Sequence, residues 1–260
     1  MQNQIGCFNR PWAQWDFEIA LEGIQAAGYE HTGLLMSQRD MLLIDTDSSP
    51  AEILEIKGLI ESHELRPAVV LASPPLNFPV QQAAEQFCRL IDNVHFLGAN
   101  YVLTCGTSNE EQYETYYQVM AECCDYAAQQ KVMLTLKPHG GISATARECL
   151  TAVERIDHPN FAIYYDPGNI HYYTGQDAAQ DIKLIANYVV GICVKDCTGL
   201  EDEVEITPGE GLVDFESVFG TLKDAGFTDL VTVECLGGET PEEINVAAQR
   251  TYEFVDSLLS

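Results

Sequence analysis

The sequence has little positive charge. Its 260 residues include 13 Lys and Arg against 40 Asp and Glu, which gives a formal net charge of −27 at pH 7. A surface of this sign repels phosphate backbones and anionic lipid headgroups. The composition therefore argues against a nucleic-acid or membrane partner, and it favours a small-molecule ligand.

The sequence also has no long apolar run. No stretch approaches the roughly 18 consecutive apolar residues that a membrane-spanning helix needs. The opening letters, MQNQIGCFNRPW, show neither the charged nor the apolar region of a secretion signal. Because 46% of the residues are hydrophobic, the chain has enough apolar side chains for a buried core. We expect a folded cytoplasmic protein.

The spacing of a zinc finger is missing too. The nine cysteines are odd in number, and no pair of C-x-x-C motifs frames a structural zinc site. We expect most of these cysteines to be buried thiols in a reducing compartment.

What the sequence does contain is one pattern repeated along its length: a short apolar strand, a polar loop, an amphipathic helix and a turn. The expected strands are residues 3–8 (NQIGCF), 31–36 (HTGLLM), 66–72 (RPAVVLA), 99–105 (ANYVLTC), 132–137 (VMLTLK), 161–166 (FAIYYD), 189–195 (VVGICVK) and 230–235 (LVTVEC). The expected helices begin near Asp16, Ser48, Val80, Asn109, Ser143, Gln176, Asp214 and Pro241.

Local signals support several of these helix boundaries. In SSPAEI, Ser49 is a candidate N-cap, with Pro50 at the first helical position and Glu52 at the third. The segments AAGYE, FLGAN and DAGFT each place a glycine where a helix should end before the next strand.

The number of repeats indicates the fold class. Eight units of roughly 30 residues match a (β/α)8 TIM barrel, which typically has about 250 residues. A doubly wound open sheet is the alternative, but it more often uses about five or six strands. No linker-like change of composition divides the chain, so we expect residues 1–260 to form a single TIM-barrel domain.

In such a barrel the active site lies at the carboxyl ends of the strands. The first four expected strands end in uncharged residues without an obvious catalytic role: Phe8, Met36, Ala72 and Cys105. Reactive residues lie at the ends of the last four: Lys137, His139, Asp166, Cys193, Lys195, Asp196 and Glu234. We therefore expect the second half of the barrel to form the reactive side of the mouth.

Some of these residues also have structural interpretations. In YYDPGN, Asp166 precedes a Pro-Gly turn and either caps that turn or faces the site. Cys193 and Lys195 have the same parity along their strand, so both face the mouth while Asp196 turns away. Lys195 then lies in a functional cleft or on a solvated rim, and Cys193 is either a site residue or packing. Because Glu234 ends an apolar strand, it should be paired, metal-bound or catalytic.

Five motifs in this order, LKPHGG, YYDPGN, VVGICVKD, TPGEGLVDF and VEC, resemble those of the xylose isomerase-like TIM-barrel superfamily, the sugar phosphate isomerase and epimerase family. The resemblance is strong in the second half of the chain and architectural in the first. The superfamily also contains inosose dehydratases and apurinic-site endonucleases. The endonuclease branch is disfavoured here by the charge of −27 and by the lack of a histidine-rich multi-metal site.

The resemblance implies a particular set of metal ligands. Typical members hold one divalent metal with a glutamate, an aspartate, a histidine and a second glutamate from the last four strands. Asp166 and Glu234 match the aspartate and the second glutamate. Lys137 stands where the first glutamate is expected, and Cys193 stands where the histidine is expected. Half of the implied metal site is therefore present.

This replacement has two interpretations. In one, His139, Asp166, Cys193 and Glu234 hold a divalent ion such as Mn, Mg or Zn, and Lys137 binds a substrate oxygen. In the other, the ammonium of Lys137 lies between Asp166 and Glu234 and replaces the metal. His139 alternatively orders only the glycine loop that follows it.

Other candidates are expected to bind substrate. Gly209 and Gly211 in TPGEGLVDF allow close backbone approach to a ligand, although an ordinary turn explains them as well. Arg10 and Trp12 follow the first strand, where Trp12 either packs on a sugar or belongs to the core or an oligomer contact. Asn169 and His171 come just after Asp166 and complete the expected substrate-binding residues.

The expected function is that of a sugar isomerase or epimerase. It removes a proton next to a carbonyl, with Glu234 as base or ligand, Lys137 and Lys195 on the enediolate oxygen, and His139 positioning that oxygen or carrying a proton. A dehydratase or lyase acting on a keto-sugar or cyclitol uses the same enolate and stays an alternative. A catalytically inactive carbohydrate-binding barrel is another. We expect a small carbohydrate as partner and leave a homo-oligomer open.

Overall fold

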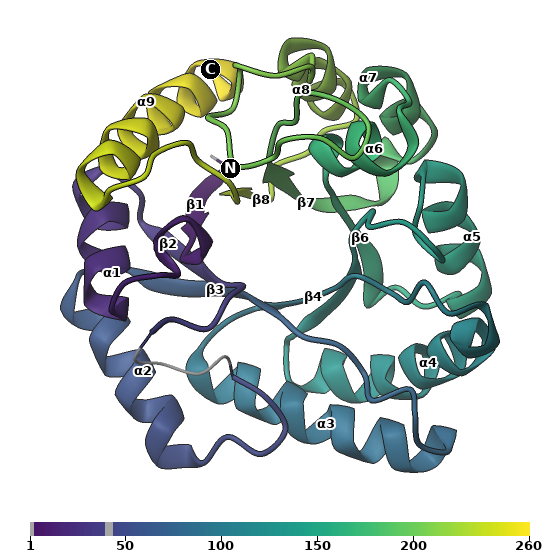
Figure 1. Ribbon diagram of the computed structural model, residues 1–260. Helices are drawn as coiled ribbons and strands as arrows, with labels where there is room; N and C mark the ends of the chain where they lie inside the picture. Colours follow the sequence, from purple (N-terminus) through teal and green to yellow (C-terminus); the bar gives the residue numbers. More distant parts are fainter. Residues whose placement is uncertain (1–2, 40–43) are drawn as a thin grey trace.

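Eight parallel strands close into a barrel in the computed structural model, which describes residues 3–39 and 44–260 (Figure 1). The strands are β1 (Gln4–Phe8), β2 (His31–Leu34), β3 (Arg66–Leu71), β4 (Tyr101–Thr104), β5 (Met133–Leu136), β6 (Phe161–Tyr165), β7 (Val189–Val194) and β8 (Leu230–Val233). Each strand pairs with the next along the chain, and β8 pairs with β1. The expected strands and the TIM barrel are confirmed, and the closed sheet excludes the doubly wound alternative.

Helices surround the barrel as an outer ring (Figure 1). The α-helices are α1 (Phe17–Ala26), α2 (Pro50–Ser62), α3 (Val80–Leu97), α4 (Tyr113–Gln129), α5 (Ala146–Ile156), α6 (Pro167–Thr174), α7 (Ala178–Asp181), α8 (Phe215–Asp224) and α9 (Pro241–Leu259). Short 3₁₀ helices are η1 (Arg10–Trp12), η2 (Glu110–Gln112), η3 (Ile182–Leu184) and η4 (Ala186–Tyr188). The last helix, α9, packs beside α1, so the ring closes as the sheet does.

The helix boundaries follow local capping chemistry. Ser49 caps α2 with a complete capping box, in which its side chain accepts from the N–H of Glu52 while the Glu52 carboxylate accepts from the N–H of Ser49. The glycine of FLGAN, Gly98, ends α3 in the left-handed region, with φ of 100°. Both signals could be read from the sequence, and both are confirmed.

The segment after β6 differs from the expected turn. Instead of a Pro-Gly turn and a helix near Gln176, α6 begins at once at Pro167, and α7 is one short turn. Asp166 is the N-cap of α6, and Pro167 has the first helical position, where a missing N–H has no cost. Gly168 lets this helix approach β7 closely, because a Cβ there would come within 2.7 Å of the carbonyl oxygen of Lys195.

Bulky side chains fill the inside of the barrel opposite glycines. The ring of Tyr164 on β6 lies against Gly191 of β7, and the ring of Phe8 lies against Gly33 of β2. A Cβ at either glycine would overlap the neighbouring ring. Tyr164 also hydrogen-bonds through its hydroxyl to Thr232 of β8. The barrel is therefore a packed core below the mouth.

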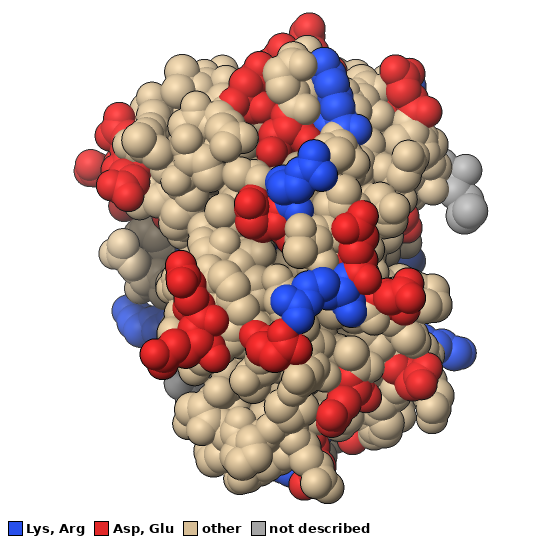
Figure 2. All heavy atoms as spheres, turned by 90° about the vertical axis from the view of Figure 1, so that its right-hand side faces the viewer, with Lys and Arg blue, Asp and Glu red and all other residues tan. Residues whose placement is uncertain are grey.

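Acidic side chains spread over the surface, as the composition predicts. The face in Figure 2 shows many acidic groups, with basic groups lying among them. Within residues 3–39 and 44–260, no helix combines the length and the apolar character needed to cross a membrane.

Candidate functional site

Four ionisable residues each follow directly after one of the last four strands. Lys137 follows β5, Asp166 follows β6, Lys195 comes just after β7, and Glu234 follows β8. Their exposed fractions are 2%, 0%, 5% and 1%, so water hardly reaches these charges. Buried charges are tolerated only when they are paired, and the structure shows that these are.

Glu234 is the centre of the cluster. Its Oε2 accepts a hydrogen bond from Lys137 Nζ at 2.5 Å, while its Oε1 lies 3.2 Å from Lys195 Nζ and 3.0 Å from an Arg10 guanidinium nitrogen. Three cations thus surround one carboxylate. The predictions that Lys137, Lys195, Arg10 and Glu234 lie at the mouth agree with this geometry.

Asp166 has a different role for each oxygen. Its Oδ1 accepts the N–H of Asn169 at 2.9 Å and so caps α6, whereas its Oδ2 lies 3.1 Å from Lys137 Nζ. The ion pair with Lys137 lacks hydrogen-bond geometry, and no group in the described part of the chain donates a hydrogen bond to Oδ2. Both interpretations of Asp166 therefore hold, one for each oxygen, and Oδ2 is a buried acceptor at the mouth.

The charges fix the protonation states. Burial would raise the pKa of Glu234, but Lys137, Lys195 and Arg10 outweigh it, so the pKa lies well below its usual value. Burial would lower the pKa of Lys137, but its negatively charged neighbours outweigh it and hold that pKa well above normal. Burial raises the pKa of Asp166, opposed by both lysines. The resting site contains an ionised Glu234 and charged lysines.

Three residues of the site have donor atoms spaced as a metal would need. An oxygen of Asp166, the sulfur of Cys193 and an oxygen of Glu234 all lie within 4.8 Å of one another. Burial raises the pKa of Cys193 well above its usual value, so its thiol is neutral. By donor type, Asp166, Cys193 and Glu234 could hold a metal ion, as three of the four predicted ligands, once the thiol of Cys193 loses its proton.

The charges already present oppose such an ion. Both oxygens of Glu234 contact a cation, so a metal bound to either at about 2.1 Å would lie within about 5 Å of an ammonium group. At an effective dielectric constant of about 20, a divalent ion and an ammonium at that distance repel each other by roughly 7 kcal/mol. A metal does not fit this site while Lys137 stays charged and in place.

The structure does not bring His139, the fourth predicted ligand, into this cluster. Its exposed ring packs against Tyr173, with the tyrosine oxygen 3.1 Å from Nε2. Partial desolvation, followed by the charges of Lys137 and Lys195, lowers the pKa of His139 to about 4. The neutral imidazole thus lies at the rim of the mouth, where its role in catalysis stays a prediction.

Arg10 belongs to the site, whereas Trp12 lies in the core. Arg10 lies on η1 and bridges Glu234 and Glu205, contacting a carboxylate oxygen of Glu205 at 2.5 Å. Trp12 is fully buried, and its indole N–H donates to Asn245 of α9. The core interpretation of Trp12 is the one that the structure supports. Glu205 had no signal in the sequence, because it lies in an exposed acidic loop.

Gly209 and Gly211 approach a protein carboxylate closely. Both donate their backbone N–H to Oδ2 of Asp196 at 2.9 Å, and the N–H groups of Val213 and Cys197 donate to Oδ1. A Cβ at Gly211 would overlap Asp196. Parity correctly predicted that Asp196 turns away from the mouth, but its anchoring of the loop was missed.

The two remaining candidates tie segments together. The side chain of Asn169 is buried and donates to the carbonyl oxygen of Pro138 at 2.7 Å. His171 is partly buried, and its Nε2 accepts the N–H of Ala178 at 3.4 Å. Their assignment to substrate binding stays a prediction, since the structure shows structural contacts for both.

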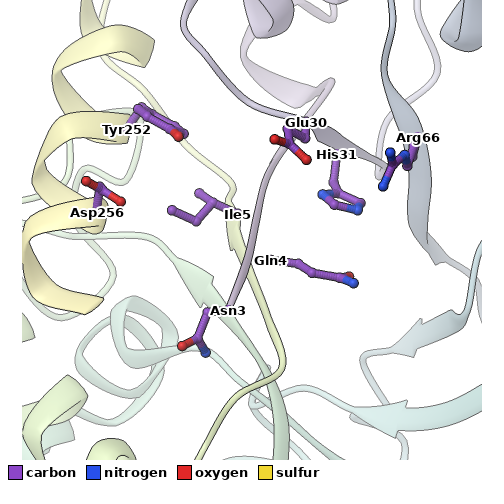
Figure 3. Close-up of a pocket in the computed structure, with 8 residues that line it drawn as sticks. All are labelled: Asn3, Gln4, Ile5, Glu30, His31, Arg66, Tyr252 and Asp256. Carbon is purple, nitrogen blue, oxygen red and sulfur yellow. The ribbon is translucent and has the colours of Figure 1, made fainter. Parts of the chain in front are cut away.

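A cavity of about 260 Å³ opens at the other end of the barrel (Figure 3). Glu30, His31 and Arg66 line it beside Tyr252 and Asp256 of α9. Glu30, His31 and Arg66 lie at the amino ends of β2 and β3, whereas active sites in this fold lie at the carboxyl ends of the strands. The cluster around Glu234 at the carboxyl ends is thus the candidate active site.

The protein is a TIM barrel, because its eight parallel strands close into one sheet. Its charged cluster lies at the carboxyl ends of the strands, where TIM-barrel enzymes have their active sites. The model of the xylose isomerase-like TIM barrel family matches residues 21–254. The chain belongs to this family, as the sequence motifs predicted.

Curated relatives are similar at low identity. Inosose isomerase from Bacillus licheniformis is 24% identical over 195 residues, which cover 67% of this chain and 69% of that protein. L-ribulose-5-phosphate 3-epimerase from Salmonella paratyphi C is 24% identical over 268 residues, with 94% and 91% covered.

Solved structures share the fold. D-allulose 3-epimerase from Methylomonas sp. has a TM-score of 0.77 at 18% identity, with 99% of this chain and 98% of that chain covered. D-psicose 3-epimerase from Clostridium cellulolyticum, solved with D-tagatose, has a TM-score of 0.77 at 16% identity, with 99% of each chain covered.

Proposed function

We propose that the protein is a sugar isomerase or epimerase that removes a proton next to a carbonyl and passes through an enediolate. The family and the names of its relatives support the substrate class, a small polyhydroxylated carbohydrate. One observation carries the proposal: Glu234, a buried carboxylate at the mouth, is surrounded by Lys137, Lys195 and Arg10.

The cations serve the oxygen on which charge develops. When a proton leaves the carbon next to a carbonyl, negative charge collects on the carbonyl oxygen, and buried N–H donors stabilise it strongly. Lys195 and Arg10 both contact Oε1 of Glu234 in the resting site. A substrate oxygen that takes over these contacts leaves Glu234 with fewer cationic partners.

The transfer of these two contacts to the substrate makes Glu234 a stronger base. With three cations around it, its pKa is held well below the usual value, and such a carboxylate accepts protons poorly. Once Lys195 and Arg10 contact a substrate oxygen instead of Glu234, the pKa of Glu234 rises toward its normal range. The base is thus activated by the substrate itself.

Two further groups are placed for substrate hydroxyls. Oδ2 of Asp166 is buried without a hydrogen-bond donor, so a hydroxyl pointing at it would satisfy both partners. At the rim, the neutral ring of His139 and the hydroxyl of Tyr173 offer a donor and acceptor pair.

The outcome depends on where the proton returns. Glu234 takes the proton from carbon and the electron pair of that bond moves to the carbonyl oxygen, giving the enediolate. Return of a proton to the former carbonyl carbon, with transfer of the remaining hydroxyl proton from one enediolate oxygen to the other, isomerises the sugar. Return of a proton to the original carbon from the opposite face epimerises it. Loss of a hydroxyl from the same enolate gives the dehydratase alternative. Isomerisation can use Glu234 on one face throughout, whereas epimerisation also needs a proton donor on the opposite face, such as water.

The test is the entry of solvent deuterium into a ketose. The protein is incubated in D2O with D-allulose, D-tagatose, L-ribulose 5-phosphate or an inosose, and proton NMR follows the hydrogen next to the carbonyl. We expect exchange with at least one of these compounds, and we expect Glu234→Gln to slow it by about 10²–10⁴-fold because the base is gone.

Matched variants keep this test sharp. Glu216→Gln makes the same change on an exposed residue of α8 and should leave the rate unaltered. Glu234→Asp keeps the charge but withdraws it from the reacting carbon, so it should fold and still lose rate. Full exchange in folded Glu234→Gln would refute the role of Glu234 as the base.

The low basicity of the resting Glu234 also supports a second candidate, a carbohydrate-binding barrel without turnover. In that case sugars would bind to the protein, for example by calorimetry, without any entry of deuterium. The same panel of sugars therefore separates the two functions.

The state of the cysteines and the net charge bear on the cellular compartment and on the partner. We infer an enzyme of the cytoplasm, because all nine cysteines are free thiols despite close approaches such as that of Cys88 and Cys123. The net charge of −27 supports a small carbohydrate over nucleic acid or an anionic membrane as partner. A homo-oligomer stays a prediction.

A further inference from the structure

We propose that the ammonium group of Lys137 is the resident cation of this site, and that the protein performs its sugar chemistry without a divalent metal. The inference rests on the proposed function for the reaction. Its evidence is the geometry around Lys137, which stands by itself.

The position of the ammonium group is the first argument. Three donor atoms, from Asp166, Cys193 and Glu234, lie within 4.8 Å of one another, which is a spacing that suits one cation. Lys137 Nζ lies 2.5 Å from the oxygen of Glu234 and 3.1 Å from the oxygen of Asp166. A cation already bridges the two carboxylates, and it is covalently part of the chain.

The charge of the site is the second argument. The family resemblance implies a glutamate at position 137 together with a divalent ion, and that pair would carry one net positive charge. Lys137 alone carries the same charge. Cys193, where a neutral histidine is implied, is fully buried, and a cysteine thiol at its ordinary pKa is uncharged near pH 7. The replacements at Lys137 and Cys193 therefore leave the charge balance of the site unchanged without a metal.

The remaining cations complete the argument. Lys195 and Arg10 occupy the second oxygen of Glu234, so this carboxylate is neutralised on both sides. An ammonium group has three N–H donors, of which Lys137 gives one to Glu234 in a hydrogen bond, while its ion pair with Asp166 lacks hydrogen-bond geometry. A donor of this ammonium group is thus left to polarise a substrate oxygen, which is the work that a metal would do as a Lewis acid.

Metal binding tests this inference independently of turnover. The protein, purified without chelator, is equilibrated with Mn²⁺ or Zn²⁺ and passed over a desalting column, and its metal content is measured by mass spectrometry. We expect no metal that depends on Glu234. We expect Lys137→Glu to bind Mn²⁺ or Zn²⁺ at least about tenfold more tightly by calorimetry, because it adds a ligand and removes the repelling charge.

Controls separate the site from the rest of the chain. Lys183→Glu makes the same change of charge on an exposed residue and should leave metal binding unchanged. Metal that stays bound in Glu234→Gln lies elsewhere and agrees with the inference. One equivalent of metal in the wild type that is lost in Glu234→Gln would overturn it, and this measurement does not depend on how Lys137→Glu folds.

The two proposals fail in different ways. Deuterium exchange that requires added Mn²⁺ or Zn²⁺ would contradict the inference and leave the isomerase or epimerase function standing. A protein without site metal and without exchange on any sugar would leave the lysine in its place and contradict the function.

Discussion

Single residues at the mouth act through the contacts that the fold gives them. Glu234 and Arg10 are separated by 224 positions in the sequence, yet their side chains form an ion pair. Asp166 caps a helix with one oxygen and faces a lysine with the other. The chemical type of each residue could be predicted from its place at the end of a strand. The partners could not, because they depend on the packing of loops from opposite sides of the barrel.

Asp196 shows the same limit and gives a test at this scale. Its carboxylate accepts four backbone N–H groups, from Cys197, Gly209, Gly211 and Val213. We expect Asp196→Ala to lower the free energy of unfolding by about 3–5 kcal/mol, because four backbone N–H groups lose their buried, charged acceptor. Urea denaturation measures this change.

The control for this change lies on the same connection between β7 and α8. Asp202 is exposed, and Asp202→Ala should alter the free energy of unfolding by no more than about 0.5 kcal/mol. If Asp196→Ala is no more destabilising than Asp202→Ala, the carboxylate does not anchor the loop.

The elements of the barrel were predictable because their signals are local and periodic. All eight strands were expected from apolar runs, and Ser49 marked the start of α2 correctly. The exception is α6, since D-P-G is typical of a turn. The same letters also place an aspartate at the N-cap and a proline at the first helical position, and the packing of Gly168 on β7 favours the helix.

Packing between elements gives a second test. Gly191 on β7 leaves room for the ring of Tyr164 on β6, and an added Cβ would overlap that ring. We expect Gly191→Ala to lower the free energy of unfolding by about 1–3 kcal/mol, because a full core must shift to accept the methyl group. The midpoint of urea denaturation at unchanged slope reports the effect.

The matched variant is Gly220→Ala in α8, where a Cβ would meet nothing within 4 Å. It should stabilise the protein by about 0.5–1 kcal/mol, because alanine loses less backbone entropy in a helix. Equal effects of the two substitutions would show that the ring of Tyr164 does not need the space at Gly191.

At the scale of the whole molecule, the barrel gathers the positive charges that the sequence has in short supply. The chain has 13 Lys and Arg, and three of them contact one carboxylate, Glu234. The fold class and the reactive side of the mouth followed from strand order. Whether a metal is used could not be decided from the sequence, because that depends on where the ammonium of Lys137 points.

The most direct measurement of the central claim is deuterium exchange by the wild-type protein after treatment with a chelator and removal of bound metal. If Lys137 is the resident cation, the treated protein exchanges the hydrogen next to the sugar carbonyl at the same rate as the untreated protein, and added Mn²⁺ does not speed it. Loss of exchange after treatment, with recovery on addition of Mn²⁺ or Zn²⁺, would contradict the account.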